Sequence, residues 1–474
     1  MRKKRRIVVC FITAVSLLTG CGIGSGNETV SFKDDNITSV ETDMIKQDKA
    51  DDMEGKLQML TDNTWQKSYS SEDGWYYIND AYEIEENDDR LPSVMYVDYK
   101  SGKSIYLCNK LNCKHNSYKC NAVLPKEADR ENTLFGQGGY LYIVSTDYDQ
   151  SGSMSSGMVI GGENSEDEPK QDVFVPTIYR MKLDGTEREK IMELESGIVL
   201  ESTFLGDGKN IYGIQKKVKY ETKDSNTYAT GCDRELVKID LQNKKIEKVI
   251  DLDNDSSILG GNERNIVIGT MDFGRTVTTE DKQKDDSLYK KAKYRLKSVN
   301  IDSGKEVELK VLKEKYCHRE MVSGSKLYIS NEKEKKVDVI DFVANKSEKI
   351  KTDIPLSIDN IIQDKSGKDI LYCIAYDSYG RDEKSWDYYL VNTESGKTIK
   401  GELKNSEKAP IEIIAQNKDS LFVLSDYKNV NEYVAWMDIN QEVIGEQEYS
   451  MISKDNYINN KANFKKVKMI GMKK

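Results

Sequence analysis

Short runs of aromatic and β-branched residues recur along most of this chain, and polar turns separate them. Such runs are typical of buried strands, whereas the spacing of apolar positions expected of an amphipathic helix is almost absent. Seven of the runs resemble one another, each preceded by a shorter strand and a polar turn. They are Gly74–Ile78, Gly139–Val144, Lys209–Ile214, Asn265–Thr270, Lys326–Ser330, Asp369–Ala375 and Ser420–Ser425.

A third strand follows each run and ends before a tight turn and a fourth strand. In the clearest copies an Asp or Asn precedes Ser-Gly-Lys, as in the segments 300–305 and 392–397. An Asx side chain caps such a turn, and Gly supplies the residue with positive φ. The predicted ends of the third strands are Asp98, Lys182, Asp240, Asn300, Asp341, Asn392 and Asp438.

Seven repeated units of four antiparallel strands predict an all-β fold, a β-propeller, with six or eight blades as alternatives. One unit cannot bury both of its faces alone, but a closed ring of such units can. A pair of sandwiches or a solenoid would fit the strands less well, because no linker divides the chain after residue 64. We therefore predict a single propeller domain over residues 64–474, with Phe464–Ile470 as a strand that helps to close the ring.

The N-terminus has the features of a lipoprotein signal peptide. Arg2–Arg6 is cationic, Ile7–Leu18 is mostly apolar, and the segment ends in Leu18-Thr19-Gly20-Cys21. An apolar segment of this length is short for a membrane-spanning helix and typical of a signal sequence. The sequence matches the lipobox of bacterial lipoproteins, which implies cleavage after residue 20 and diacylglyceryl modification of Cys21. Anchoring by several acyl chains would hold the protein at the cell membrane, facing outside the cytoplasm.

Residues 21–63 are polar, charged and poor in aromatic residues, so they are predicted to form a disordered tether. Within this tether, Asp52–Leu60 has apolar residues at helical spacing and is predicted to form a short helix. Loss of residues 1–20 removes five basic residues and changes the formal net charge from −10 to −15. A surface this acidic repels phosphate backbones, which argues against a nucleic-acid partner.

The lipobox, the acidic tether, the degenerate repeats and the segment Leu107–Cys120 together resemble a group of Gram-positive propeller lipoproteins. The blade pattern is also loosely similar to that of TolB-type propellers. The resemblance covers essentially the whole chain. It implies the fold and the lipid-anchored location, but no chemistry.

Nearly all the long insertions fall on one rim of the predicted ring, which is formed by the second-to-third and fourth-to-first connections of the blades. They are Asp149–Asp172, Lys219–Asp233, Gly274–Lys293 and Tyr376–Asp387. We call this rim the long-loop rim, and the opposite one, built from turns such as Ser303–Lys305 and Ser395–Lys397, the short-turn rim. Loops on a rigid scaffold commonly carry function. Aromatic side chains in the insertions suit contact with a protein, a peptide or a glycan, although they can equally pin the loops to the blades. These candidates are Tyr220, Tyr228, Tyr289, Tyr376, Tyr379 and Trp386.

The segment between the first and second blades contains Cys108, Cys113, His115 and Cys120. Three thiols and an imidazole are a donor set that can enclose a structural zinc ion, although the spacing is not that of a standard zinc knuckle. Outside the cytoplasm a disulfide is the competing interpretation, and simple packing is a third. A closed set of four ligands would leave no open position for a catalytic metal. No cofactor is certain.

Other chemical signals are weak. Asp251, Asp253 and Asp255 alternate as at the start of a calcium loop, but Ser256 and Asn262 replace the Gly and Glu that such a loop requires. No nucleophile elbow, phosphate-binding loop or metalloprotease motif is present, so we assign no catalytic residue. The sequence favours a non-catalytic binding module. The alternative is a hydrolase or lyase that acts on a cell-surface polymer at the long-loop rim.

Overall fold

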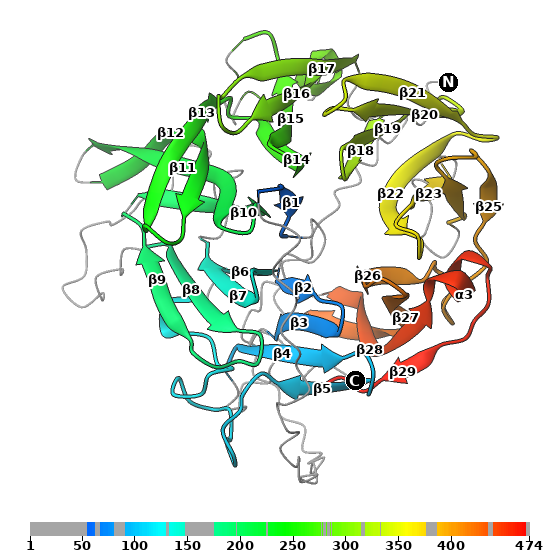
Figure 1. Ribbon diagram of the computed structural model, residues 1–474, viewed down its shortest axis with the longest axis horizontal. Helices are drawn as coiled ribbons and strands as arrows, with labels where there is room; N and C mark the ends of the chain where they lie inside the picture. The colour runs from blue at the N-terminus through cyan, green and yellow to red at the C-terminus, as the bar shows by residue number, and fades with distance from the viewer. Residues whose placement is uncertain are drawn as a thin grey trace.

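The computed structural model places seven antiparallel sheets in a ring, so the protein is a seven-bladed β-propeller (Figure 1). The structure describes residues 55–61, 67–79, 91–128, 132–146, 175–195, 197–223, 226–275, 287–313, 318–331, 333–375, 386–434 and 439–470, with the single residues 277, 281 and 285. None of the helices in these ranges has the length and apolar character that a bilayer-spanning helix needs.

Each blade consists of four strands that are consecutive in the chain, and the first strand of each lies nearest the centre of the ring. The strands of blades 1 to 3 are β2 (Ser68–Ser70), β3 (Gly74–Asn79), β4 (Ser93–Asp98), β5 (Lys103–Tyr106); β6 (Asn132–Gln137), β7 (Tyr140–Ser145), β8 (Thr177–Lys182), β9 (Glu189–Glu193); β10 (Ile198–Gly206), β11 (Asn210–Lys223), β12 (Asn226–Asp240) and β13 (Lys245–Leu252).

Blades 4 to 7 repeat this order. Their strands are β14 (Ser256–Asn262), β15 (Asn265–Asp272), β16 (Lys293–Asn300), β17 (Glu306–Lys313); β18 (His318–Ser323), β19 (Lys326–Asn331), β20 (Lys336–Asp341), β21 (Lys346–Lys351); β22 (Leu356–Gln363), β23 (Asp369–Ala375), β24 (Tyr388–Asn392), β25 (Thr398–Lys400); β26 (Glu412–Gln416), β27 (Ser420–Val434), β28 (Ile439–Ser453) and β29 (Lys465–Val467). Three short helical segments are described as well: η4 (Lys126–Ala128), α2 (Ser287–Lys291) and α3 (Lys454–Ile458).

The predicted Asx turns join the third and fourth strands of the blades. The Asn300 Oδ1 accepts the backbone N–H of Ser303 at 3.1 Å, and the Asn392 Oδ1 accepts that of Ser395 at 2.9 Å. Gly304 and Gly396 follow with φ of +66° and +69°, a conformation that costs a residue with a Cβ atom energy. These local bonds close the turns after Asn300 and Asn392 on the short-turn rim.

The seventh blade departs from the predicted repeat. Its third strand was expected to end at Asp438, which lies outside the described residues, but β28 begins at Ile439 and ends at Ser453. The prediction was wrong because β27 and β28 are each 15 residues long, far longer than most of their counterparts. The actual end of the third strand is Ser453, whose hydroxyl caps α3.

Seven hydrophobic cores hold the ring together, one at each joint between neighbouring blades. The joint between blades 7 and 1 is closed without a shared strand. Trp75 of β3 packs against Phe422 of β27, with ring centroids 5.1 Å apart. Lys468, just after β29, also forms a parallel bridge with Lys103 of β5. The prediction that a strand within residues 464–470 helps to close the ring is confirmed.

The propeller begins before residue 64. Residues 58 and 59 form β1 (Gln58–Met59), which pairs antiparallel with β10 as a fifth strand of blade 3 on its inner side (Figure 1). Leu57 and Leu60 on either side of β1 are 1% and 7% exposed. The predicted helix over 52–60 is wrong for its described part, because the inner edge of β10 offers backbone hydrogen bonds to an extended chain. The signal peptide and residues 21–54 of the predicted tether lie outside the described residues.

Candidate metal centre and ligand-binding rim

The four residues of the predicted zinc or disulfide site converge in the loop between blades 1 and 2. One donor atom from each of Cys108, Cys113, His115 and Cys120 lies within 4.8 Å of the others. The loop follows β5 directly, and a hydrogen bond from the backbone N–H of Leu107 to the carbonyl of Val94 fixes its first residue. These residues can therefore hold a metal ion.

Tight backbone turns bring the ligands together. Asn112 and His115 both adopt positive φ, 56° and 54°, which reverses the chain on either side of Cys113. The backbone N–H of Cys120 donates to the carbonyl of Ser117 at 2.8 Å and begins the last turn of the loop. Because the turns are irregular, ligands with non-standard spacing reach one point.

Cys120 is the most deeply placed of the four ligands, at 2% exposure, and it packs with Ala122 and Val123. The His115 Nδ1 lies 3.3 Å from the Cys120 Sγ. One face of the imidazole is covered by Tyr106 of β5, whose ring is stacked on it. The imidazole is thus held with one nitrogen directed at the thiol cluster.

Blade 2 supports the loop from outside. The Arg188 guanidinium, just before β9, donates hydrogen bonds to the carbonyls of Tyr118, Asn121 and Val123. Gly185 in the β8–β9 turn has φ of +77°, and a Cβ atom there would lie 2.4 Å from the carbonyl oxygen of Leu107. The cluster therefore lies at the outer part of the joint between blades 1 and 2.

The thiols differ in acidity. Burial raises the pKa of Cys120 to about 12. Burial alone would also raise the pKa of Cys113, but hydrogen bonds from the His115 backbone N–H and the neighbouring thiols outweigh it and lower that pKa. Burial lowers the pKa of His115, which keeps the imidazole neutral and able to bind a metal.

The arrangement fits a closed site with three sulfur ligands and one nitrogen ligand. Such a donor set is typical of structural zinc, because no position remains for a reacting water. Cys108, Cys113 and Cys120 are free thiols here, as are Cys232 and the fully buried Cys373. Convergence of all four donors favours a metal over a disulfide, which would engage only two of the three thiols.

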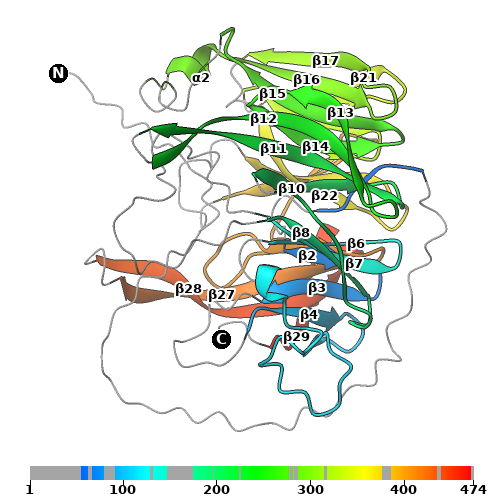
Figure 2. The same ribbon diagram turned by 90° about the vertical axis from the view of Figure 1, so that its left-hand side faces the viewer.

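Two long hairpins project from the long-loop rim (Figure 2). One is formed by β11 and β12 of blade 3, and the other by β27 and β28 of blade 7. The predicted contact residues Tyr220 and Tyr228 lie on neighbouring positions of the first hairpin, where Tyr220 pairs with Ala229 and Tyr228 with Glu221. Their side chains are not described.

The other predicted aromatic contacts have separate positions. Tyr289 of α2 makes an edge contact with Phe273, with ring centroids 5.5 Å apart. Trp386 packs partly buried against the core between blades 6 and 7, so it pins the loop before β24. Tyr376 and Tyr379 lie outside the described residues. The two candidates whose side chains are described, Tyr289 and Trp386, therefore lie in different blades.

The predicted calcium ligands are divided. Asp251 in β13 is 79% exposed on its side chain and pairs with Lys248 at 3.0 Å. Asp253 and Asp255 instead line a cavity of about 430 Å³ on the long-loop rim of blade 4. Among the described residues, the three carboxylates do not converge on one point as metal ligands would.

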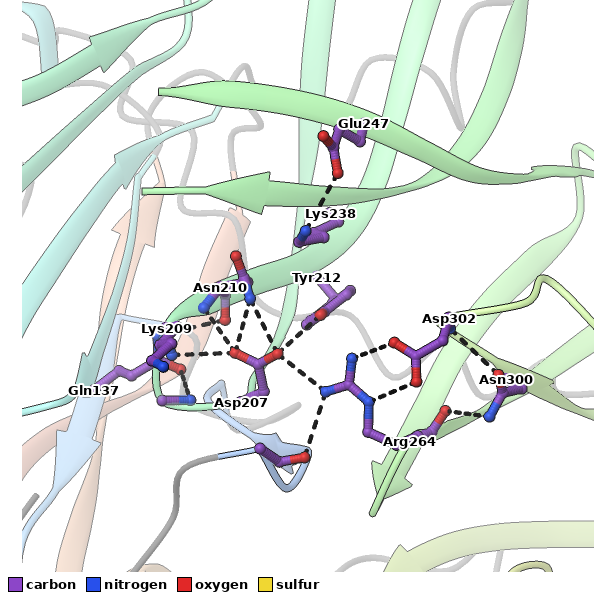
Figure 3. Close-up of polar contacts among 12 residues, drawn as sticks. Gln137, Asp207, Lys209, Asn210, Tyr212, Lys238, Glu247, Arg264, Asn300 and Asp302 are labelled. Atoms are coloured by element: carbon purple, nitrogen blue, oxygen red, sulfur yellow. Dashed lines mark hydrogen bonds and ion pairs between the residues drawn. The ribbon is translucent and has the colours of Figure 1, made fainter. Parts of the chain in front are cut away.

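A second polar group lies on the short-turn rim at the joint of blades 3 and 4 (Figure 3). The Arg264 guanidinium donates to Asp302 at 2.9 Å and to the buried Asp207 at 3.2 Å. It also donates to the carbonyl of Gly55 at 3.4 Å, while the Gly55 N–H donates to the carbonyl of Asp207 at 2.9 Å. Asp207 accepts a further hydrogen bond from the Tyr212 hydroxyl. The first described residue is thereby tied to this rim.

Sequence reasoning missed the other residues of the blade 4 cavity, above all Phe273 and Arg295. It also missed Arg264. Phe273 lies at the end of a second strand and directly before the predicted insertion Gly274–Lys293. This position was the only sequence signal that could have identified it as a site residue. Arg295 and Arg264 belong to a strand and a short turn and carry no local signature.

No protein-family model matches the chain, and none of the curated proteins is detectably similar to it in sequence. Among solved structures it is similar to a puromycin hydrolase, with 8% identity, a TM-score of 0.44, and coverage of 80% of this chain and 53% of that one. It is also similar to the acylaminoacyl peptidase of Pyrococcus horikoshii, with 13% identity, a TM-score of 0.45, and coverage of 83% and 51%.

The β-propeller domain of the trilobed protease of Pyrococcus furiosus is a further similar structure, with 12% identity, a TM-score of 0.43, and coverage of 87% of this chain and 96% of that one. This chain spans about half the length of the hydrolase and of the peptidase. At such identities the similarity concerns the fold alone.

Proposed function

We propose that this protein is a lipid-anchored, extracytoplasmic propeller that binds a protein, peptide or glycan at its long-loop rim without catalysing a reaction. The lipobox ending in Cys21 supports the anchor. The membrane is one partner, through the acyl chains on Cys21, and the ligand at the rim is the other.

The position of Gly55 carries this proposal. It is bound to Asp207 and Arg264 on the short-turn rim, and β1 continues from there into the ring. An anchor at Cys21 would thus hold the protein from the short-turn side. The long-loop rim, with its two hairpins, would then lie on the side of the ring opposite the attachment of the tether (Figure 2).

The chain before Gly55 is long enough to separate the propeller from the lipid. The 33 residues between Cys21 and Gly55 can span at most roughly 120 Å. The propeller would stand clear of the lipid surface, with the long-loop rim open to large ligands.

We also propose that Cys108, Cys113, His115 and Cys120 hold a structural zinc ion. The ion would cross-link a loop that has no strand or helix of its own before η4. With its ligands in place, the loop carbonyls that accept hydrogen bonds from Arg188 would keep their positions. The metal would then stiffen the joint between blades 1 and 2.

Two experiments on the full-length chain in cells test the binding proposal. A Cys21→Ala variant should leave the membrane fraction, because it cannot be lipidated. A photo-crosslinking amino acid, p-benzoylphenylalanine, is placed at Tyr228 on the long-loop rim, and in a control at Asn243 on the short-turn rim. We expect a reproducible adduct from position 228 only.

The opposite result would overturn the proposal. Adducts from position 243 alone would place the ligand on the wrong rim. Turnover of a purified cell-wall polymer, with no adduct from position 228, would favour the hydrolase or lyase alternative.

A further inference from the structure

The cavity in blade 4 lies where two connections of the long-loop rim meet. The β13–β14 connection contributes Asp253 and Asp255, and the end of β15 with the residues after it contributes Asp272, Phe273 and Arg275. At about 430 Å³ the cavity has the volume of a site for a small ligand or for one or two units of a polymer.

The charges around the cavity balance. The wall contains three carboxylates and three cationic groups, so its described part has no net charge. The members are Asp253, Asp255, Asp272, Arg275, Arg295 and Lys297. An anion or a cation placed here would meet groups of its own sign as well as groups of the opposite sign.

Ion pairs fix several of these groups in place. The Arg295 guanidinium bridges Asp272 and Glu308, with both distances at 2.8 Å. Lys297 pairs with Glu306 at 2.8 Å. The Asp272 carboxylate also accepts the backbone N–H of Gly274 at 2.8 Å. The wall therefore contains both donors and acceptors, and ion pairs already order several of them, which reduces the entropy lost on binding.

The wall also contains an aromatic ring. Phe273 is held by its edge contact with Tyr289 of α2, at 75° between the ring planes. A fixed aromatic ring beside paired donors and acceptors suits a ligand with an apolar face and a polar edge. A sugar ring has such a face of C–H groups and an edge of hydroxyls.

We propose that the blade 4 cavity binds an uncharged sugar unit of a glycan. A hydroxyl both donates and accepts hydrogen bonds, so neighbouring hydroxyls can satisfy carboxylates and cations at once. The inference rests on the proposed function of the long-loop rim, and it names the ligand class and its site. A peptide is the main competing ligand, because it too combines apolar and polar groups.

Asp253 and Asp251 provide a matched pair of variants. The Asp253 carboxylate lines the cavity and forms no hydrogen bond or ion pair with any described side chain, so Asp253→Ala should leave the fold intact. Asp251, two residues earlier, is exposed beside Lys248 and lies outside the cavity wall. Asp251→Ala is therefore the control for a general loss of negative charge.

The test uses the full-length chain purified in detergent and calorimetric titration with defined probes. These are the uncharged hexamers of glucose and N-acetylglucosamine, the carboxylated hexamer of galacturonate, and a pool of neutral hexapeptides. We expect one uncharged sugar hexamer to bind and Asp253→Ala to weaken that binding at least about tenfold, the effect of losing a hydrogen bond to a charged group. Asp251→Ala should change it less than twofold.

Phe273→Ala is the second variant and should also weaken binding, at an unchanged melting temperature. Preference for galacturonate or for the peptides, or failure of every uncharged hexamer to bind, would overturn the inference. So would equal effects of the two aspartate variants. If position 228 still cross-links a ligand in that case, the proposed binding function stands and only the sugar assignment falls.

Discussion

The imidazole of His115 lies parallel to the ring of Tyr106, with 4.3 Å between the ring centroids and 7° between the planes. This stacking directs the His115 Nδ1 toward the Cys120 thiol, 3.3 Å away. The His115 imidazole is therefore already in position and would not have to reorient in order to bind a metal. The aromatic ring that orients it belongs to strand β5 of blade 1.

Zinc content tests the metal centre directly. We expect about one zinc ion per chain in protein purified without chelator, because the four donors already converge. Cys120→Ser should lose the metal and lower the melting temperature, measured by elemental analysis and thermal unfolding. Cys232→Ser, a free cysteine outside the cluster, is the control and should keep the metal. Absence of zinc, with at most one free thiol among Cys108, Cys113 and Cys120, would establish the disulfide instead.

The stacking of Tyr106 on His115 should strengthen metal binding without contributing a ligand. Residues that orient a ligand typically change metal affinity by about ten- to a hundredfold. Tyr106→Leu should therefore weaken zinc affinity by about tenfold in competition with a chromophoric chelator. Tyr106→Phe keeps the ring and should bind zinc as the wild type does. Equal losses in both variants would show that the hydroxyl, and not the stacking, is responsible.

Asp359 should make the protein less stable at neutral pH than a neutral residue would. It is the additional residue at a bulge in β22, the strand of blade 6 nearest the centre of the ring, and its side chain keeps some contact with solvent. The surrounding protein nevertheless displaces much of the hydration of the carboxylate, which raises the pKa of Asp359, and the charge of Arg319 only partly opposes this. A raised folded-state pKa means that stability is lost as the pH rises from the unfolded value of about 3.9 through the folded value.

Asp359→Asn should accordingly raise the melting temperature at pH 7. The difference in melting temperature from the wild type should disappear near pH 3.5, where the Asp359 carboxyl is largely protonated in the folded and the unfolded protein. Thermal unfolding across this pH range measures the difference. Asp353→Asn changes an exposed aspartate just before the same strand and should have little effect at any pH. An advantage of Asp359→Asn that persists at pH 3.5 would contradict the electrostatic explanation.

Arg264 should hold the entering chain to the ring. Arg264→Ala removes hydrogen bonds to Asp302, Asp207 and the Gly55 carbonyl (Figure 3). Hydrogen bonds to charged groups contribute about 1.5–3 kcal/mol each at most, and this side chain is partly exposed, so we expect the free energy of unfolding to fall by about 1–2 kcal/mol. Denaturant unfolding measures this change.

The same variant should make the chain near residue 55 easier to cleave with protease. Arg180→Ala removes an ion pair with Glu189 on blade 2, far along the chain from Gly55, and is the matched control. If both variants increase cleavage near residue 55 equally, Arg264 has no special role in holding the entering chain.

Much of the fold could be predicted because its signals are local. The strands have apolar runs of their own, and turns such as Asn300–Lys305 contain the Asx side chain and the Gly that close them. Repetition of these signals predicted the blades and their number. The predictions were wrong for the end of the third strand of blade 7 and for residues 55–61. The structure of neither segment depends on a local signal. The length of β28 is set by its pairing with β27, and β1 is a strand only because β10 offers it an edge.

The candidate sites show the same division. The sequence by itself determined the blade repeat, the cluster of three cysteines and a histidine that could hold zinc or form a disulfide, and the crowding of long connections on one rim, because these depend on residue type and spacing within one segment. Only the tertiary structure decided that Tyr106 orients His115, that Arg264 holds Gly55, and that Asp253 lines the same cavity as Arg295 while Asp251 does not. Some of these relationships bring together residues that are far apart in the chain. One of them places two nearly adjacent residues in different surroundings. They follow from the closure of the ring, in which each blade packs against the next and sets where the connections between strands lie.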